Sequence, residues 1–347
     1  MRIGRWLTVS VAGLTGLALA GCGQGQSAAP AEDGLQVVAT TSILGDITRN
    51  VVGDAGSVAV LLEPGTDPHG FEPSAQQTAA LREADLVVAN GLELVPSLND
   101  GLRAAEDSGV NVLRVAEKVD PVPFDGAGDH AQGKESHENA EGEPHAEGDA
   151  HTEGDVHADG EQHGNEQASG ALDPHVWLDP VRMAEGVELI GDRVATVAGG
   201  QAETVRDSAA RYADRVRSTH QRVKEILSDV PAQARTLVTN HDAVGYFAQR
   251  YGFEVVGTVI PGGSTLSDPS SGELAELVAT IKRAQVPAIF AETTVSTRLA
   301  ETVSREAGGG IEVVQLYTDS LAPEGEAATY LGMLTADAER IARGLSG

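Results

Sequence analysis

From Leu35 onward the chain alternates short apolar runs with longer segments of helical character. The first runs are LQVVATTS, VAVLLEPG, DLVVANG and NVLRVAE, and helical segments such as SAQQTAALREA, with Ser74 as its cap, lie among them. The alternation returns after residue 230 with ARTLVTN, EVVGTVI, VPAIFAE and IEVVQLY. Strands that alternate with helices form mainly parallel sheets covered by helices. The sequence therefore predicts an α/β fold with two α/β lobes.

One long helix is predicted between these lobes, over residues 201–230. About thirty helical residues span roughly 45 Å. An apolar stripe is expected along it, made by Ala210, Tyr212, Ala213, Val216, Val223, Ile226 and Leu227. The predicted division is an N-terminal lobe over 35–200, this rigid linking helix, and a C-terminal lobe over 231–347.

The N-terminus has the pattern of a bacterial lipoprotein signal. Arg2 and Arg5 precede an apolar run too short to cross a membrane comfortably, and Leu-Ala-Gly-Cys ends at Cys22. We expect a signal peptide over 1–21, a lipid on Cys22 and a flexible tether over 22–34. The protein would then be extracytoplasmic and anchored to the bacterial membrane, on the cell surface or in the periplasm. The alternative is an ordinary signal peptide with a chance cysteine. Cys22 is the only cysteine, so no internal disulfide can form.

A polar insertion interrupts the first lobe over residues 124–170. Its Asp, Glu, Gly and Ala content buries too little apolar surface to order the segment, so we expect it to be disordered. Histidines in flexible segments commonly bind metal ions, and neighbouring carboxylates assist them. This insertion is therefore a candidate accessory metal-binding loop, and the alternative is an acidic solubility spacer. Its six histidines are His130, His137, His145, His151, His157 and His163.

The formal net charge of −28 restricts the partners of the chain. No basic patch is present to hold nucleic acid, so nucleic-acid binding is excluded. A strongly negative protein attracts cations instead.

Four histidines lie outside the insertion. His69 and His241 each follow a predicted strand, as does Asp319, and His175 lies in the Pro-bracketed loop ALDPHVWLDP. His220 lies in the middle of the long helix, and we expect it to face solvent with no role in a site. Ligands bind beyond the carboxyl ends of parallel strands. Three histidines and one carboxylate there match a closed tetrahedral zinc site.

The same segments resemble a known family, the metal-binding lipoproteins of zinc and manganese ABC importers, or cluster A-I solute-binding proteins. The motifs that carry the resemblance are EPGTDPHGFEPS, DPHVWLDP, TNHDAVGYFAQRYGFEVVG, AIFAETTVSTRLAETVSREAG and LYTDSL. The resemblance implies two lobes joined by a rigid helix, with Zn²⁺ or, less well supported, Mn²⁺ held between them by His69, His175, His241 and Asp319. Histidine rather than glutamate at position 241 points to zinc, as does the His-rich insertion. The implied partners are an ABC permease and its ATPase, and the protein is expected to act as a monomer.

Two other functions remain open at this point. A zinc hydrolase would keep three protein ligands and a bound water beside a general base. Glu292 could be that base or a hydrogen-bond partner of a ligand imidazole, and the resemblance favours the second role. The chain contains no HExxH or GxSxG motif. A stand-alone surface zinc buffer would have the same site without a transporter.

Overall fold

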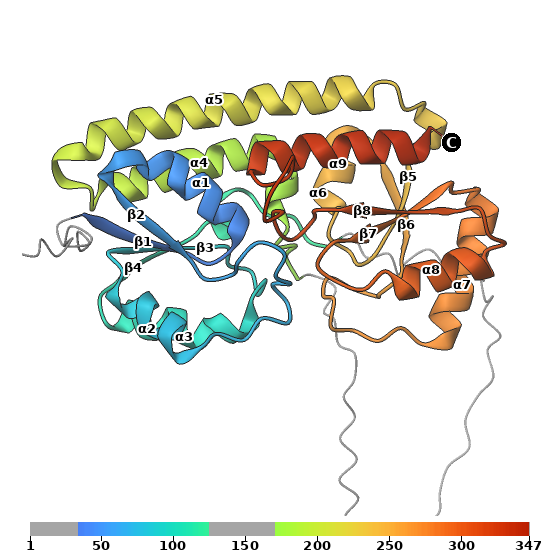
Figure 1. Cartoon of the computed structure of the whole chain (residues 1–347), viewed down its shortest axis with the longest axis horizontal. Helices are drawn as coiled ribbons and strands as arrows, with labels where there is room; N and C mark the ends of the chain where they lie inside the picture. The colour runs from blue at the N-terminus through green and yellow to red at the C-terminus, as the bar shows by residue number, and fades with distance from the viewer. Residues whose placement is uncertain (1–33, 125–170, 347) are drawn as a thin grey trace, which may run out of the picture. The chain divides into compact units, whose positions relative to one another are not determined.

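The first four strands form one sheet in which every neighbouring pair is parallel (Figure 1). Its spatial order is β2-β1-β3-β4. The strands are β1 (Leu35–Ala39), β2 (Gly56–Val60), β3 (Leu86–Ala89) and β4 (Asn111–Arg114). The central strand β3 is buried along its whole length, because helices cover both faces of the sheet.

The second sheet repeats this arrangement, again with parallel neighbours, in the order β6-β5-β7-β8. Its strands are β5 (Thr236–Thr239), β6 (Glu254–Thr258), β7 (Ala288–Glu292) and β8 (Glu312–Leu316). The predicted α/β fold with two mainly parallel sheets is therefore confirmed. This computed structural model describes residues 34–124 and 171–346. The predicted signal peptide and most of the insertion lie outside this range.

Helices cover both sheets (Figure 1). In the first half of the molecule they are α1 (Ser42–Val52), α2 (Ala75–Glu83), α3 (Asn99–Asp107) and α4 (Pro180–Ala195). In the second half they are α6 (Gly245–Tyr251), α7 (Ser271–Ala284), α8 (Arg298–Glu306) and α9 (Tyr330–Leu345). Ser74 caps α2 as predicted, in a reciprocal pair with Gln77. Ser270 caps α7 in the same way, in a reciprocal pair with Glu273.

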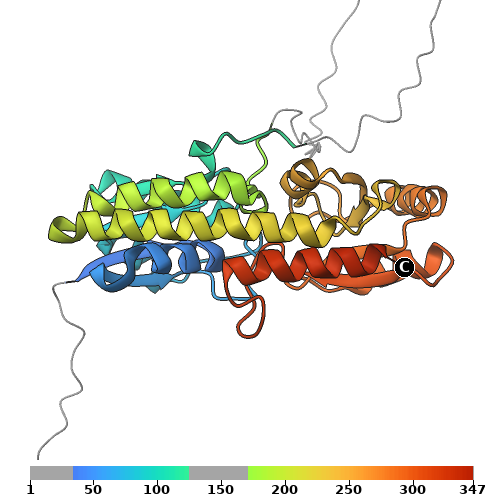
Figure 2. The same cartoon turned by 90° about the horizontal axis from the view of Figure 1, so that it is seen from above.

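The long helix α5 (Ala202–Leu227) packs against α1, α4 and α9, and so contacts both halves of the molecule (Figure 2). The expected apolar stripe is largely present, since Tyr212, Ala213, Val216, Val223 and Leu227 are buried and Ile226 is half-buried. Ala210 is the exception: it is exposed, and Ala209 is buried against α4 in its place. His220 is half-buried rather than solvent-facing, and its Nδ1 lies 3.1 Å from the Tyr251 hydroxyl of α6. Within the described residues, no helix combines the length and apolar character needed to cross a membrane.

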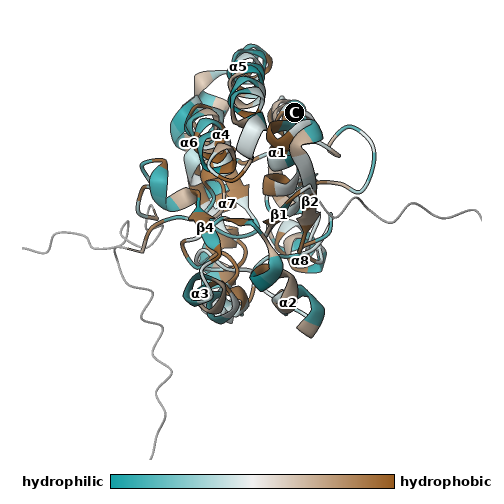
Figure 3. Ribbon diagram, turned by 90° about the vertical axis from the view of Figure 1, so that its left-hand side faces the viewer, coloured by the Kyte–Doolittle hydropathy of each residue, from teal (hydrophilic) through white to brown (hydrophobic). Residues whose placement is uncertain are grey.

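The apolar core is shared between the two halves. Its larger cluster includes Val37 of β1, Val216 of α5, and Phe290 and Met333 of the second half. A smaller cluster lies between the second sheet and helices α7 and α8. In Figure 3 hydrophobic segments gather inside the helical layers. The described residues from Leu35 onward form one compact unit, so the lobe boundaries given above remain our proposed division.

Candidate metal centre

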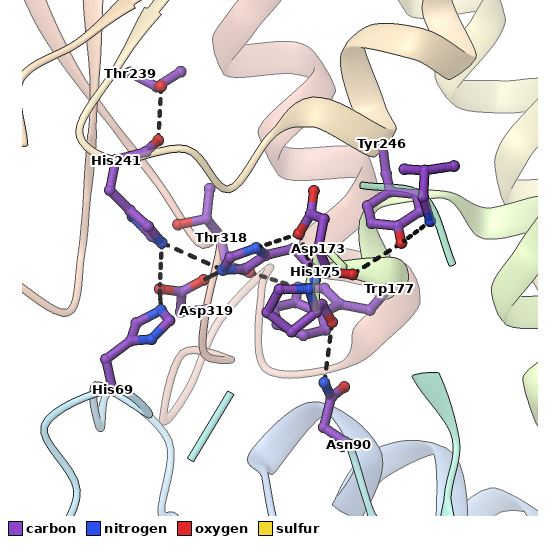
Figure 4. A network of polar contacts seen from close by, with 12 residues as sticks. His69, Asn90, Asp173, His175, Trp177, Thr239, His241, Tyr246, Thr318 and Asp319 are labelled. Atoms are coloured by element: carbon purple, nitrogen blue, oxygen red, sulfur yellow. Dashed lines mark hydrogen bonds and ion pairs between the residues drawn. The ribbon is translucent and has the colours of Figure 1, made fainter. Parts of the chain in front are cut away.

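The side chains of His69, His175, His241 and Asp319 come together in one buried cluster (Figure 4). His69 lies in the loop after β2, while His241 and Asp319 closely follow β5 and β8. His175 directly precedes the short 3₁₀ helix Val176–Leu178. One nitrogen or oxygen atom from each residue lies within 4.8 Å of the others. The two sequence halves thus contribute two residues each.

The spacing of these atoms fits a small tetrahedral ion. The Nε2 atoms of His175 and His241 are 3.3 Å apart. Each of the three histidine Nε2 atoms lies 3.8 Å from an oxygen of Asp319. Bonds of about 2.0–2.1 Å in a tetrahedron place its corners about 3.3 Å apart. The cluster therefore needs only a small contraction to coordinate zinc.

The hydrogen bonding of the cluster also indicates a cation. Nε2 of His69 and both carboxylate oxygens of Asp319 are buried and have no hydrogen-bond partner. Buried polar atoms without partners carry a large desolvation cost. A metal ion bound to these atoms would remove that cost, since all three face the centre of the cluster.

Carboxylates orient two of the imidazoles. Nδ1 of His175 lies 2.7 Å from Oδ1 of Asp173, and Nδ1 of His241 donates to Oε1 of Glu292. A carboxylate at Nδ1 keeps the proton there, so the Nε2 lone pair points at the metal. Glu292, the last residue of β7, therefore has the geometry of the hydrogen-bond partner that the sequence suggested.

Asp173 was missed in the sequence, although a signal was present. Asp-Pro-His occurs twice, at residues 67–69 and 173–175. In both copies the aspartate Oδ1 accepts from the backbone N–H of the histidine, over 3.0 Å at Asp67 and 2.9 Å at Asp173. Such short-range bonds fix the turn that presents each histidine. The repeat could have identified both aspartates as positioning residues.

The electrostatics of the cluster are dominated by burial. Burial, together with the nearby His175 and His241, lowers the pKa of His69 to about 3. The pKa of His175 is also well below its usual value, for the same reasons. Burial opposes the charged form of His241 too, but Glu292 and Asp319 together outweigh it and raise its pKa to about 9. Burial and the charge of Glu292 raise the pKa of Asp319.

Contacts between the two halves hold Asp319 in place. The indole N–H of Trp177 donates to the carbonyl of Thr318 over 2.6 Å. On the other side, the hydroxyls of Ser320 and Ser42 lie 3.1 Å apart, and the N–H of Gly65 donates to Ser320 over 2.8 Å. The backbone on either side of Asp319 is thus attached to the first half.

The other residues singled out in the sequence lie elsewhere. Cys22 and the six histidines of the insertion fall outside the described residues. His220 is not part of the cluster; its Nδ1 contacts the hydroxyl of Tyr251, the last residue of α6.

Two parallel sheets, a long helix that contacts both halves of the molecule, and a buried His₃Asp cluster to which both halves contribute define a cluster A-I solute-binding protein, the component that binds the substrate of a metal ABC importer. Residues 37–344 match the model of the ZnuA family, the periplasmic component A of the zinc-uptake complex, and the chain belongs to this family.

Relatives of known type support this placement. The chain is 29% identical over 333 residues to the manganese-binding lipoprotein MntA of Halalkalibacterium halodurans, which covers 95% of both chains. It is 31% identical over 314 residues to the zinc-binding lipoprotein AdcA of Streptococcus pneumoniae, which covers 89% of this chain and 54% of AdcA. The solved structure of TroA, a periplasmic zinc-binding protein from Treponema pallidum, superposes with a TM-score of 0.72 at 26% identity, over 90% of this chain and 99% of TroA.

Proposed function

We propose that this protein captures extracytoplasmic zinc between its two halves and delivers the ion to a membrane permease. The observation that carries the proposal is the buried cluster of His69, His175, His241 and Asp319, with unpartnered atoms that face a common centre. Zinc is the cargo in this function, so the site must bind it tightly yet release it to the permease.

The choice of zinc over manganese rests on the donor atoms. The relatives include both zinc-binding and manganese-binding lipoproteins at similar identity, so the likeness supports either metal. Three imidazoles and one carboxylate suit zinc, whereas manganese prefers more oxygen ligands. Replacing an imidazole with a carboxylate, as in His241→Glu, should therefore shift the preference toward manganese.

A catalytic role is disfavoured by the same geometry. A zinc hydrolase keeps one coordination position open for water, but four protein ligands complete a tetrahedral site. Glu292 hydrogen-bonds His241, so its carboxylate orients a ligand instead of a water molecule.

The cellular setting is proposed from the N-terminus and the relatives together. A lipid on Cys22 would anchor the protein outside the cytoplasm, like the lipoproteins that it resembles. The partners would be an ABC permease and its ATPase, and the protein would act as a monomer. A stand-alone zinc buffer would bind metal equally well. Zinc uptake by cells that lack this protein separates the two functions. Loss of an importer component should lower uptake as much as loss of the permease does, whereas loss of a buffer should leave uptake unchanged.

The His-rich insertion is proposed to collect zinc for the main site. The N–H of Phe124 donates to the carbonyl of Ala171 over 3.1 Å, so the insertion begins and ends at one place. The Phe124 ring lies 6.3 Å from the His175 ring, which puts that place beside the cluster. Tethering raises the effective concentration of loosely bound zinc there.

Replacing the six insertion histidines with serine, while keeping every carboxylate, tests this collector. Weak additional zinc should disappear, loading at scarce zinc should slow, and the tight site should remain. Unchanged weak stoichiometry and growth in low zinc would support the acidic spacer instead.

The main site is tested by His175→Ala, with His220→Ala as a matched control outside the cluster. Loss of one ligand should weaken zinc binding sharply, because only three of the four cluster residues then remain to coordinate the metal at about 2.0–2.1 Å. Competitive titration with zinc and manganese should show a zinc preference in the parent and in His220→Ala. An unchanged zinc affinity in His175→Ala would overturn the assignment.

A further inference from the structure

The short helix α6 (Gly245–Tyr251) follows His241 closely and crosses to the segment that carries His175. That segment runs over residues 173–179, and α6 contacts it at both ends through Tyr246 and Arg250. His175 and His241, whose Nε2 atoms are 3.3 Å apart, are therefore also connected through the protein, by α6 and its contacts with this segment.

At one end, Tyr246 contacts the residue that orients His175. Its hydroxyl donates to the carbonyl of Asp173 over 2.9 Å and accepts from the N–H of Val122 over 3.0 Å (Figure 4). The Asp173 carboxylate in turn contacts Nδ1 of His175. Tyr246 is fully buried, so its position is fixed by packing.

At the other end, Arg250 makes a bidentate contact with Asp179. Its Nε lies 2.8 Å from Oδ1 and its Nη2 2.6 Å from Oδ2. Asp179 is buried and also caps α4, through the N–H of Val181 over 2.9 Å. A planar guanidinium facing a carboxylate in this way fixes direction as well as distance. Arg250 therefore ties α6 to the start of α4.

We propose that Tyr246 and Arg250, here called the α6 clasp, are positioning residues that set the spacing of His175 and His241 and thereby the metal preference of the site. The proposal rests on the proposed function. The clasp holds the two Nε2 atoms at the 3.3 Å that a small tetrahedral ion requires. A looser pair would fit larger ions with more ligands, such as manganese, at the expense of zinc.

Arg250→Met and Tyr246→Phe test the clasp, and Arg217→Met is the control. Arg217 of α5 also pairs with an acidic residue of α4, with its Nη2 2.6 Å from Oε1 of Glu188, but Glu188 lies outside the segment 173–179. Loss of either clasp residue should lower zinc affinity about 10–100-fold, as for other residues that orient metal ligands. The ratio of zinc to manganese affinity should fall with it, while Arg217→Met should retain the parent ratio.

Cobalt reports the geometry directly, because tetrahedral Co²⁺ absorbs visible light much more strongly than octahedral Co²⁺. The cobalt-loaded clasp variants should show weaker visible absorption than the parent, at temperatures where circular dichroism shows that they are folded. Arg250→Lys, which keeps the charge but not the bidentate contact, should recover little of it. If Arg250→Met does not fold, Tyr246→Phe decides, since it removes only a hydroxyl.

Folded clasp variants with the parent's cobalt spectrum and metal ratio would overturn the clasp alone. If His175→Ala bound metal as tightly as the parent protein, the proposed function itself would be overturned. The two failures are therefore distinguishable in one set of variants.

Discussion

Burial and nearby carboxylates act in opposite directions on the pKa of His241. Its imidazole is buried, yet Glu292 and Asp319 raise its pKa to about 9. Below that value the metal-free centre holds a proton on His241, and zinc requires the neutral ring. Proton competition should therefore extend well above the ordinary imidazole value of about 6.5.

The predicted consequence is proton release on zinc binding. Because the folded-state pKa is raised, zinc affinity should increase about tenfold per pH unit from pH 7 to about 9 and then level off. Calorimetry in buffers of different ionisation enthalpy should count about one proton released near pH 7. Zinc affinity that is flat over this range would count against a protonated His241.

Glu292 should affect both affinity and its pH dependence. Glu292→Gln retains an acceptor near Nδ1 of His241 but removes the charge, so zinc affinity at pH 9 should fall about 10–100-fold. The pKa of His241 should fall as well, which moves the onset of proton competition to lower pH. The exposed Glu306→Gln serves as the control, and equal titration curves for the two variants would refute a role for Glu292.

At the scale of elements, the contact between α4 and α5 depends on Gly191. A Cβ on Gly191 would lie 2.3 Å from the Cβ of Ala209, so only glycine permits this approach. Gly191→Ala should separate the helices and cost about 1–3 kcal/mol in the free energy of unfolding. Gly200→Ala, which meets nothing within 4 Å, is the control. Equal denaturation midpoints would show that the helix pair tolerates the methyl group.

Most elements could be predicted from the sequence, because apolar β-branched runs and capped amphipathic segments are local signals. Their ends were less predictable. The strand expected over VAVLLEPG begins earlier, at Gly56, and ends at Val60, because pairing with β1 sets its limits. Ala210 was expected on the buried face of α5, but it is exposed. Its neighbour Ala209 is buried instead, because it packs against Gly191 of α4.

At the scale of the whole molecule, the placement of His69, His241 and Asp319 in loops after strands was predictable, and ligands bind beyond the carboxyl ends of parallel strands. The contacts that hold those residues were not. Tyr246 with Asp173 and Trp177 with Thr318 join segments from different halves, and their pairing depends on how the two halves meet. The larger apolar cluster runs through both halves. Because packed interiors resist gradual deformation, we expect zinc release to involve small local shifts around the site.

We propose that three imidazoles and one carboxylate hold a single zinc ion. X-ray absorption at the zinc edge tests this coordination, on protein with the six insertion histidines replaced by serine and one equivalent of zinc added. We expect four light-atom ligands at about 2.0–2.1 Å, with the outer scattering of three imidazoles. Two or fewer imidazoles, or a six-coordinate zinc shell, would contradict it.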